Sequence, residues 1–273
     1  MSDLVLTEKR GLTAGPATIG ATIQRQRSNF LRLVTQLDPA GWSAKTRCTA
    51  WSVHDVVRHV VNVAELHVAL LSGSPDVGRF LRHGPFHPAT TPALWLADSP
   101  AQSPEETVQT LTDLVARERE LFQARAVGPE GPLMPAPSGR QLHWSTLSLH
   151  MLWDAWIHER DVALALGLEP ESRAEDFPLV TMYGLLIAGG VGVLVGNPPA
   201  ATLALRGATE SRYEIGVAED DVFVAAGVDG DPQGHGAADE VLDSLTGREP
   251  ELARALTAQE PVLASLGVLR QVM

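Results

Sequence analysis

One long segment constrains the fold more than any other: HWSTLSLHMLWDAWIHERDVALALG, at residues 143–167. Its apolar residues recur with helical periodicity, so it predicts one long helix that ends at Gly167. At about 100° per residue, one face of this helix carries the titratable side chains His150, Asp154, His158 and Asp161. Tryptophan and leucine cover the other faces and also require burial. Buried carboxylates and imidazoles are costly unless they are paired or bound to a metal, so this polar stripe requires partners from elsewhere in the chain.

Three upstream segments also have the periodicity of amphipathic helices, at about residues 18–37, 53–71 and 104–122. Ser52 and Asp55 predict a capping box at the start of the second segment. Ser103 and Glu106 predict the same arrangement before the third. Four amphipathic helices, one of them with a polar stripe that points inward, predict a helical bundle with a site in its core.

Beyond Gly167 the pattern changes to short elements. Strands are predicted at residues 202–206, 212–217 and 222–226, and helices at residues 237–245 and 251–256. The sequence therefore predicts a mainly α chain of two domains, a bundle over residues 1–167 and a small α+β domain over residues 168–273. Residues 1–16 are expected to form a loose leader.

Two stretches rich in proline and glycine, residues 73–100 and 127–140, are predicted as loops. They are longer than simple connections require, so we expect them to shape the entrance to a site.

An uncharged stretch, LVTMYGLLIAGGVGVLVG at residues 179–196, approaches the length of a membrane span. We interpret it as a buried helix, because it contains several glycines and has no flanking basic cluster. Its GxGxxxG run at residues 190–196 is not interpreted as a dinucleotide-binding motif, because no ordinary strand precedes it.

Composition excludes several classes of function. The net charge is −12; residues 1–167 carry 15 of the 21 basic and 16 of the 33 acidic residues, which leaves 6 basic and 17 acidic for residues 168–273. Neither part has the basic surface of a nucleic-acid-binding protein. Cys48 is the only cysteine, so an intramolecular disulfide is excluded. The N-terminus lacks the pattern of a signal peptide, and a cytoplasmic protein is expected.

Asp154 and His158 have the spacing i, i+4, which places a carboxylate and an imidazole on one helical face as two ligands of a divalent cation. The same spacing is also typical of an ordinary hydrogen-bonded ion pair, and spacing alone leaves both interpretations open. His59 lies on the apolar stripe of the helix predicted over residues 53–71. It is either a further ligand or a hydrogen-bonded core histidine.

Two motifs carry a resemblance to a known family. CTAWSVHDVVRHVV at residues 48–61 and LHMLWDAWIHERDV at residues 149–162 together resemble the mycothiol-dependent maleylpyruvate isomerase family, of the DinB-like bundle superfamily. The resemblance implies a metal-binding four-helix bundle followed by an α+β domain. It also implies a divalent metal, usually zinc, with His59, Asp154 and His158 as ligands. The carboxylate ligand of the family is usually glutamate, so Asp154 departs from the pattern by one methylene.

The resemblance further implies a thiol chemistry. Three protein ligands leave one position open on a tetrahedral zinc, and a thiol bound there is deprotonated at neutral pH. In the family this thiol is mycothiol, and the reactions include cis–trans isomerisation and thiol transfer. The implied partners are a small-molecule substrate and the thiol cofactor, with no nucleic acid and no membrane, in a monomer or homodimer. The alternatives are a thiol-independent, metal-dependent hydrolase or lyase on the same bundle, and a non-catalytic metal- or ligand-binding module.

Two more residues of the polar stripe, His150 and Asp161, are predicted to support the site, His150 as a partner of the ligands or as an acid–base group, and Asp161 as the residue that orients His158. Asp161 is otherwise a charge near the end of the helix. His67, two turns after His59, is either a further supporting residue or a hydrogen-bonded core histidine, and the second interpretation applies equally to His150.

Three other residues near these motifs receive structural interpretations. Cys48 precedes the helix over residues 53–71 with no adjacent base evident in the sequence, so we predict a structural role. Glu159 and Arg160 are predicted to lie on the surface.

Overall fold

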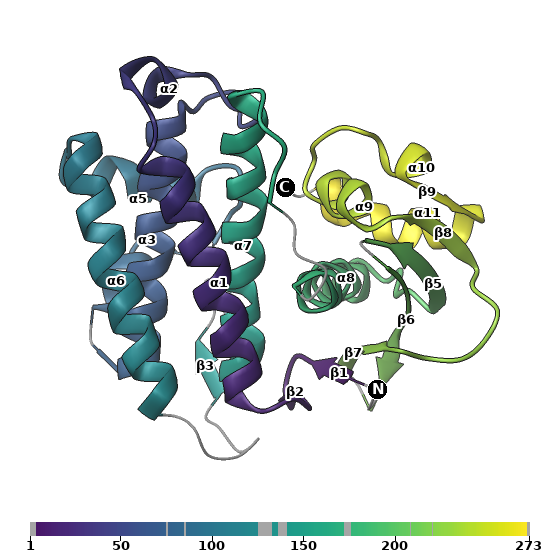
Figure 1. The fold of residues 1–273 in the computed structure, drawn as a ribbon. Coiled ribbons are helices and arrows are strands. Elements are labelled where there is room, and N and C mark those ends of the chain that lie inside the picture. Colours follow the sequence, from purple (N-terminus) through teal and green to yellow (C-terminus); the bar gives the residue numbers. More distant parts are fainter. Residues whose placement is uncertain are drawn as a thin grey trace. The chain divides into compact units, whose positions relative to one another are not determined.

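The computed structural model describes residues 4–74, 76–84, 86–124, 133–135, 141–171, 176–207, 209–219 and 221–271. They form two compact units. One spans Gly15–Glu171, and the other combines Met1–Ala14 with Ser172–Met273. The first unit is a helical bundle, and the second combines a sheet with helices (Figure 1). The predicted fold class, mainly α with a bundle followed by a small α+β part, is confirmed.

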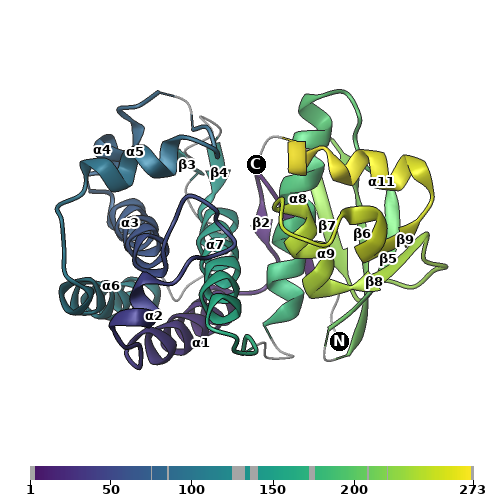
Figure 2. The ribbon, with the colours of Figure 1, turned by 90° about the horizontal axis from the view of Figure 1, so that it is seen from above.

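Four long helices build the bundle: α1 (Pro16–Val34), α3 (Val53–Ser72), α6 (Pro104–Ala124) and α7 (Trp144–Ala165). The helices α1 and α3 each pack against both α6 and α7. Figure 1 shows the four helices side by side, and Figure 2 looks along them. A short helix, α2 (Pro39–Ser43), lies between α1 and α3. All four helices predicted from periodicity are therefore present, with ends shifted by a few residues.

Side-chain caps fix where two of these helices begin. Oγ of Ser52 accepts a hydrogen bond from the backbone N–H of Asp55, and Oδ2 of Asp55 accepts one from the backbone N–H of Ser52. Oε2 of Glu106 accepts from the backbone N–H of Ser103 at 2.7 Å in the same way. These caps satisfy amide groups that the first turn of a helix leaves unpaired. The cap on α3 thereby fixes the start of the helix that carries His59.

Residues 73–100 are not the plain loop predicted from their composition. They contain α4 (Val77–Leu81) and α5 (Thr91–Asp98). Proline in the first turn of α5 is compatible with a helix, because the N–H that it lacks would have no partner there. The rings of Phe80 and Trp95 meet edge to face at 5.1 Å and join the two short helices. The many proline and glycine residues led to the prediction of a loop, and helices as short as α4 and α5 were missed.

The other predicted loop, residues 127–140, lies mostly outside the described residues. Within it, β3 (Leu133–Pro135) pairs antiparallel with β4 (Gln141–His143), which leads directly into α7. The entrance proposed between the two loops therefore stays a prediction.

The second unit contains a sheet of strand order β2-β1-β7-β6-β5-β8-β9. Its strands are β1 (Leu4–Thr7), β2 (Gly11–Leu12), β5 (Ala201–Arg206), β6 (Glu210–Ala218), β7 (Asp221–Ala226), β8 (Gly234–Ala237) and β9 (Leu256–Ala258). Its helices are α8 (Phe177–Leu194), α9 (Ala238–Leu245), α10 (Leu252–Ala255) and α11 (Glu260–Gly267), followed by a 3-10 turn at Leu269–Gln271. The strands predicted at residues 202–206, 212–217 and 222–226 are confirmed as β5, β6 and β7.

The prediction of a loose leader is wrong for residues 4–14. Leu6 of β1 pairs with Val224 of β7, and its side chain is fully buried. This strand is too short to show a clear alternation in the sequence, so only its pairing partner, far along the chain, reveals it. The N-terminal strands consequently belong to the unit that contains the C-terminus, and the bundle unit begins at Gly15.

The uncharged stretch forms α8, which by length and composition alone would suffice to cross a membrane, but 72% of it is buried inside the protein. It packs against β6 and β7 of its own unit. A Cβ at Gly189 would lie 2.8 Å from Cγ1 of Val222, and one at Gly192 would lie 2.7 Å from the carbonyl oxygen of Asn197. The prediction of a buried helix is confirmed, and close packing accounts for these glycines.

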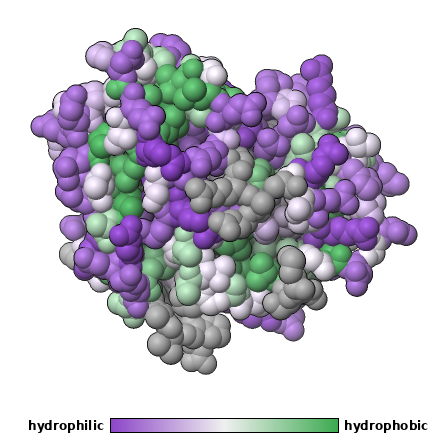
Figure 3. All heavy atoms as spheres, in the orientation of Figure 1, coloured by the Kyte–Doolittle hydropathy of each residue, from purple (hydrophilic) through white to green (hydrophobic). Residues whose placement is uncertain are grey.

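The surface agrees with the charged composition. On the face shown in Figure 3, hydrophilic side chains predominate, and apolar ones gather over the end of α7. Leu164 and Leu168, at that end, are 41% and 48% exposed.

Candidate metal centre

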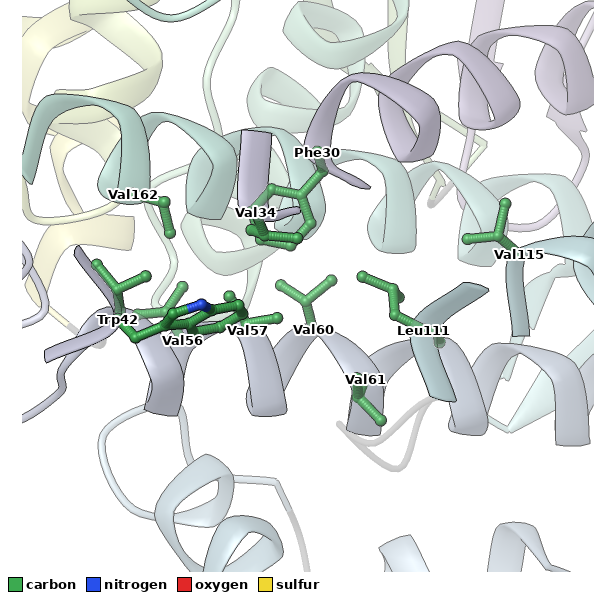
Figure 4. Close-up of a cluster of buried hydrophobic side chains, with 12 residues drawn as sticks. Phe30, Val34, Trp42, Val56, Val57, Val60, Val61, Leu111, Val115 and Val162 are labelled. Carbon is green, nitrogen blue, oxygen red and sulfur yellow. The ribbon is translucent and has the colours of Figure 1, made fainter. Parts of the chain in front are cut away.

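Tightly packed valines fix the polar residues between α3 and α7. Val56 and Val60 of α3 and Val162 of α7 are fully buried in one apolar cluster (Figure 4). Val60 follows His59 in the sequence, and Val162 follows Asp161. The packing that buries these valines therefore also sets the positions of the two polar neighbours.

The three predicted ligands come together between α3 and α7. Nε2 of His59 lies 3.3 Å from Oδ1 of Asp154, and Nε2 of His158 lies 3.7 Å from the same oxygen. The two imidazole rings meet edge to face with centroids 4.9 Å apart. One ligating atom from each residue lies within 4.8 Å of the others. A single ion would therefore be within reach of all three side chains.

Burial and the neighbouring charges shift the pKa values of this cluster in opposite directions. The side chains of His59 and His158 are 5% and 9% exposed, and that of Asp154 is 15% exposed. Burial disfavours the charged carboxylate, but His59 and His158 outweigh it and hold the pKa of Asp154 well below its usual range. Burial also disfavours the imidazolium, but Asp154 and the hydrogen bond that His158 donates to Asp161 outweigh it and raise the pKa of His158 to about 10. Without a cation, the cluster is thus a buried carboxylate paired with a protonated imidazole.

The second ring nitrogen of His158 faces the predicted orienting residue. Nδ1 of His158 lies 3.0 Å from Oδ2 of Asp161, whose side chain is fully buried. Asp161 is therefore not a solvated charge at the helix end. A carboxylate at Nδ1 favours the tautomer that carries its proton there, which leaves Nε2 free to face Asp154.

Arg47 and Trp51 also contact this cluster and were missed from the sequence. Nε of Arg47 donates to Oδ1 of Asp161 at 2.9 Å, and the ring of Trp51 lies 5.1 Å from that of His59. Both residues precede α3 in an irregular segment, where no periodicity predicts which way a side chain points. The only sequence signal for either residue was that Trp51 lies within the motif at residues 48–61.

Cys48 lies closer to the site than its sequence context indicated. Its Sγ lies 3.3 Å from Oδ2 of Asp161, and Cys48, His158 and Asp161 form a second group with ligating atoms within 4.8 Å of one another. The absence of a neighbouring base in the sequence was misleading, because Asp161 comes from the far end of the bundle sequence.

His150 and His67, the two histidines that the sequence left open, have different environments in the structure. His150 is partly buried one turn before Asp154; burial lowers its pKa, Asp154 opposes this, and His59 and His67 reinforce it. His67 instead hydrogen-bonds Glu118 and Ser148, at 2.7 and 3.0 Å. His67 is therefore a hydrogen-bonded core histidine outside the ligand cluster.

The prediction of surface positions for Glu159 and Arg160 is wrong. They are only 6% and 8% exposed. Oε2 of Glu159 accepts a hydrogen bond from Nε2 of Gln26 on α1 at 3.2 Å, and the guanidinium of Arg160 lies 4.9 Å from the ring centre of Trp156. Charged residues are seldom buried without such partners, which spacing along one helix does not reveal.

The donor set fits a divalent cation. Tetrahedral zinc with ligands at about 2.0–2.2 Å has ligand atoms about 3.3–3.6 Å apart, and the separations at Asp154 are 3.3 and 3.7 Å. Oδ2 of Asp154 is buried without a hydrogen-bond partner among the described residues. Such an acceptor costs about 1–3 kcal/mol unless something binds it. Two imidazoles and a carboxylate would hold a metal while leaving a position for a small molecule.

Comparison with known proteins identifies a matching family and solved structures of similar fold. A family profile described as the mycothiol maleylpyruvate isomerase N-terminal domain matches residues 23–163. Two crystal structures of mycothiol-dependent maleylpyruvate isomerase, one of them a histidine-to-alanine variant, are similar in fold with TM-scores of 0.56 and 0.58. Each is 12% identical in sequence, and the match covers 89% of this chain and 92% of the other. No curated protein sequence matches the chain.

Proposed function

The chain belongs to the mycothiol maleylpyruvate isomerase family by the match to its N-terminal domain, and from this premise we propose that it is a metal-dependent, mycothiol-dependent enzyme. We assign a divalent metal, with zinc as the expected ion, to His59, Asp154 and His158. The substrate is a small metabolite, and the reaction is a cis–trans isomerisation or the transfer of the thiol.

The observation that carries the metal assignment is the environment of Asp154. Its Oδ1 lies within 3.7 Å of Nε2 of both histidines, and its Oδ2 has no hydrogen-bond partner in the described part of the chain. A structural ion pair would be expected to satisfy both oxygens, because an unsatisfied buried acceptor is destabilising. A cation that also interacts with this second oxygen would remove the deficit.

When bound there, the metal would supply a Lewis acid that stabilises the deprotonated form of a thiol at neutral pH. The chain itself supplies the geometry. His59 and His158 present their Nε2 atoms, and Asp161 retains the proton on Nδ1 of His158. The ring of Trp51 lies 5.1 Å from that of His59, and we expect it to limit access of water on that side.

We assign proton transfer to His150. It lies one turn before Asp154 on the same helix, and burial lowers its pKa, so its imidazole is neutral near pH 7. A neutral imidazole can accept the proton that the thiol loses and can later return it to the product.

The proposed setting follows from the charge of the chain. A net charge of −12 without a basic patch in the sequence supports a small-molecule substrate rather than nucleic acid or an acidic membrane surface. We propose a cytoplasmic monomer or homodimer that acts on a metabolite together with the thiol cofactor.

Metal analysis and thiol titration test this function together. The purified protein is expected to contain one divalent metal per chain, and mycothiol added to the cobalt-loaded protein is expected to produce a saturable thiolate-to-cobalt charge-transfer band. Cys48→Ser is titrated alongside, so that the band is assigned to mycothiol and not to the protein thiol. Metal without thiol binding would favour the thiol-independent hydrolase or lyase. Absence of both would favour a non-catalytic module that binds another ligand.

A further inference from the structure

Residues 44–53, which join α2 to α3 and end at the first residue of α3, are held by hydrogen bonds among themselves. The backbone N–H of Val53 donates to the carbonyl of Ala44 at 2.9 Å, and that of Trp51 donates to the carbonyl of Cys48 at 2.7 Å. Oγ1 of Thr46 lies 3.1 Å from the carbonyl oxygen of Trp51. Residues 44–53, called the 44–53 loop below, are therefore braced at both ends and across the middle.

The 44–53 loop places two hydrogen-bond donors on one buried carboxylate. Nε of Arg47 lies 2.9 Å from Oδ1 of Asp161, and Sγ of Cys48 lies 3.3 Å from Oδ2. The same Oδ2 lies 3.0 Å from Nδ1 of His158. Asp161 is fully buried, whereas the Arg47 side chain is 23% exposed. Arg47 and Cys48 thus link the loop, through Asp161, to Nδ1 of His158, and Arg47 is the one of the two that carries a positive charge.

We propose that Arg47 is a positioning residue of the metal centre: it fixes the carboxylate of Asp161, which in turn fixes the tautomer and ring orientation of His158. This inference rests on the proposed function for the presence of the metal. It goes beyond the ligand assignment, because it gives the 44–53 loop a role in orienting one of the ligands.

The physical reason is the limited freedom of a carboxylate that has donors on both oxygens. Arg47 holds Oδ1, while His158 and Cys48 share Oδ2, so rotation of the group would break at least one of these contacts. Arg47 also balances the charge of a carboxylate that has no access to solvent. If Arg47 is removed, the carboxylate can turn away from Nδ1, and the Nε2–H tautomer of His158 becomes accessible. That tautomer cannot bind a metal through Nε2.

The experiment measures zinc affinity by competition with a chelator for the wild type, Arg47→Ala, Asp161→Asn and the double variant. Partners that orient a metal-bound histidine typically change affinity about 10–100-fold, and we expect about tenfold weaker binding for Arg47→Ala. Asp161→Asn is expected to weaken binding at least as much. The double variant is expected to equal Asp161→Asn, because the proposed effect of Arg47 on His158 is exerted through Asp161.

Matched variants separate this effect from a general loss of structure. Arg117→Ala removes another arginine of the bundle, from an exposed pair with Glu120, and is expected to bind zinc as the wild type does. Arg47→Lys retains a cationic donor and is expected to recover part of the lost affinity. If Arg47→Ala folds poorly, Arg47→Lys provides the comparison instead.

A second readout reports on the ring itself. In the ¹⁵N-histidine NMR spectrum of the zinc-loaded wild type, we expect a slowly exchanging Nδ1–H on His158, which is weakened or lost in Arg47→Ala. Unchanged affinity and an unchanged Nδ1–H signal in Arg47→Ala would overturn the inference. An equal loss of affinity from Arg47→Ala with and without the Asp161→Asn substitution would overturn it as well. A wild type that binds no zinc would instead contradict the proposed function.

Discussion

Nδ1 of His67 lies 2.7 Å from Oε1 of Glu118 in the interior of the bundle, where both side chains are at most 1% exposed. Glu118 also accepts from Arg27 at 3.2 and 3.3 Å, and His67 contacts Ser148 at 3.0 Å. These four residues come from α6, α3, α1 and α7, so one buried polar network connects all four helices. Truncating one member of such a network leaves a buried charge without its partner.

Glu118→Gln is expected to destabilise the protein at neutral pH by about 3 kcal/mol, the cost typical of breaking a buried ion pair. Burial raises the pKa of Glu118, but Arg27 and His67 outweigh it and lower the pKa to about 2. A carboxylate with a depressed pKa stabilises the fold above its unfolded-state value of about 4.5, and this contribution is lost as the pH falls towards about 2. Urea unfolding followed by circular dichroism at pH 7 and at pH 3 measures both effects.

The wild type should therefore lose more stability than Glu118→Gln between pH 7 and pH 3. Glu120→Gln is the matched control, because Glu120 is on the same helix, exposed, and paired only with Arg117 among the ion pairs described. Equal acid sensitivity of the wild type and Glu118→Gln would mean that the network does not hold Glu118 in its charged form.

His59→Ala is expected to abolish stoichiometric metal binding. Within the candidate ligand group, His59 is the member that comes from α3, and two ligands on α7 alone would leave the cation bound weakly. Elemental analysis of the purified variant measures the metal content, with His87→Ala as a control at an exposed histidine. Full metal content in His59→Ala would show that the ligand assignment is wrong.

The sequence predicted those parts of the fold that depend on regular spacing. Helix α7 and its polar stripe were predictable, because period 3.6 placed Asp154, His158 and Asp161 on one face without knowledge of any neighbour. The start of α3 was predictable because the capping box is a local signal. His59 required the family resemblance, since one histidine on an apolar stripe has no distinctive spacing.

Contacts between distant segments were not predictable in this way. Strand β1 forms only by pairing with β7, and Arg47 reaches Asp161 only because the 44–53 loop folds back over α7. Glu159 was expected at the surface because no local pattern reveals that Gln26 of α1 lies beside it. In each case the missing information was the identity of a partner far along the chain.

Metal binding is expected to release about one proton per ion at pH 8. Burial disfavours the imidazolium of His158, but Asp154 and Asp161 raise its pKa to about 10, so the metal-free protein holds this proton at pH 8. A metal ligand must be neutral imidazole, so zinc displaces the proton and its affinity rises with pH up to about 10. Calorimetry in buffers of different ionisation enthalpy measures the number of protons released. Heats that do not depend on the buffer would contradict this assignment of charge.

Asp154→Glu is expected to retain the metal, whereas Asp154→Ala is expected to lose metal and activity together. Aspartate is shorter by one methylene than the glutamate usual at this position in the family that the sequence resembles, so in this protein the carboxylate lies close to α7, within 3.3 and 3.7 Å of the two Nε2 atoms. A glutamate can reach the same ion by changing rotamer, because the side chain at this position is 15% exposed and not fully enclosed. The ion would then shift away from α7, which should alter the turnover rate more than the metal content. Elemental analysis and steady-state kinetics on the two variants measure these quantities. If Asp154→Ala keeps its metal, Asp154 is not a ligand, and the reaction inferred from the family loses its main support.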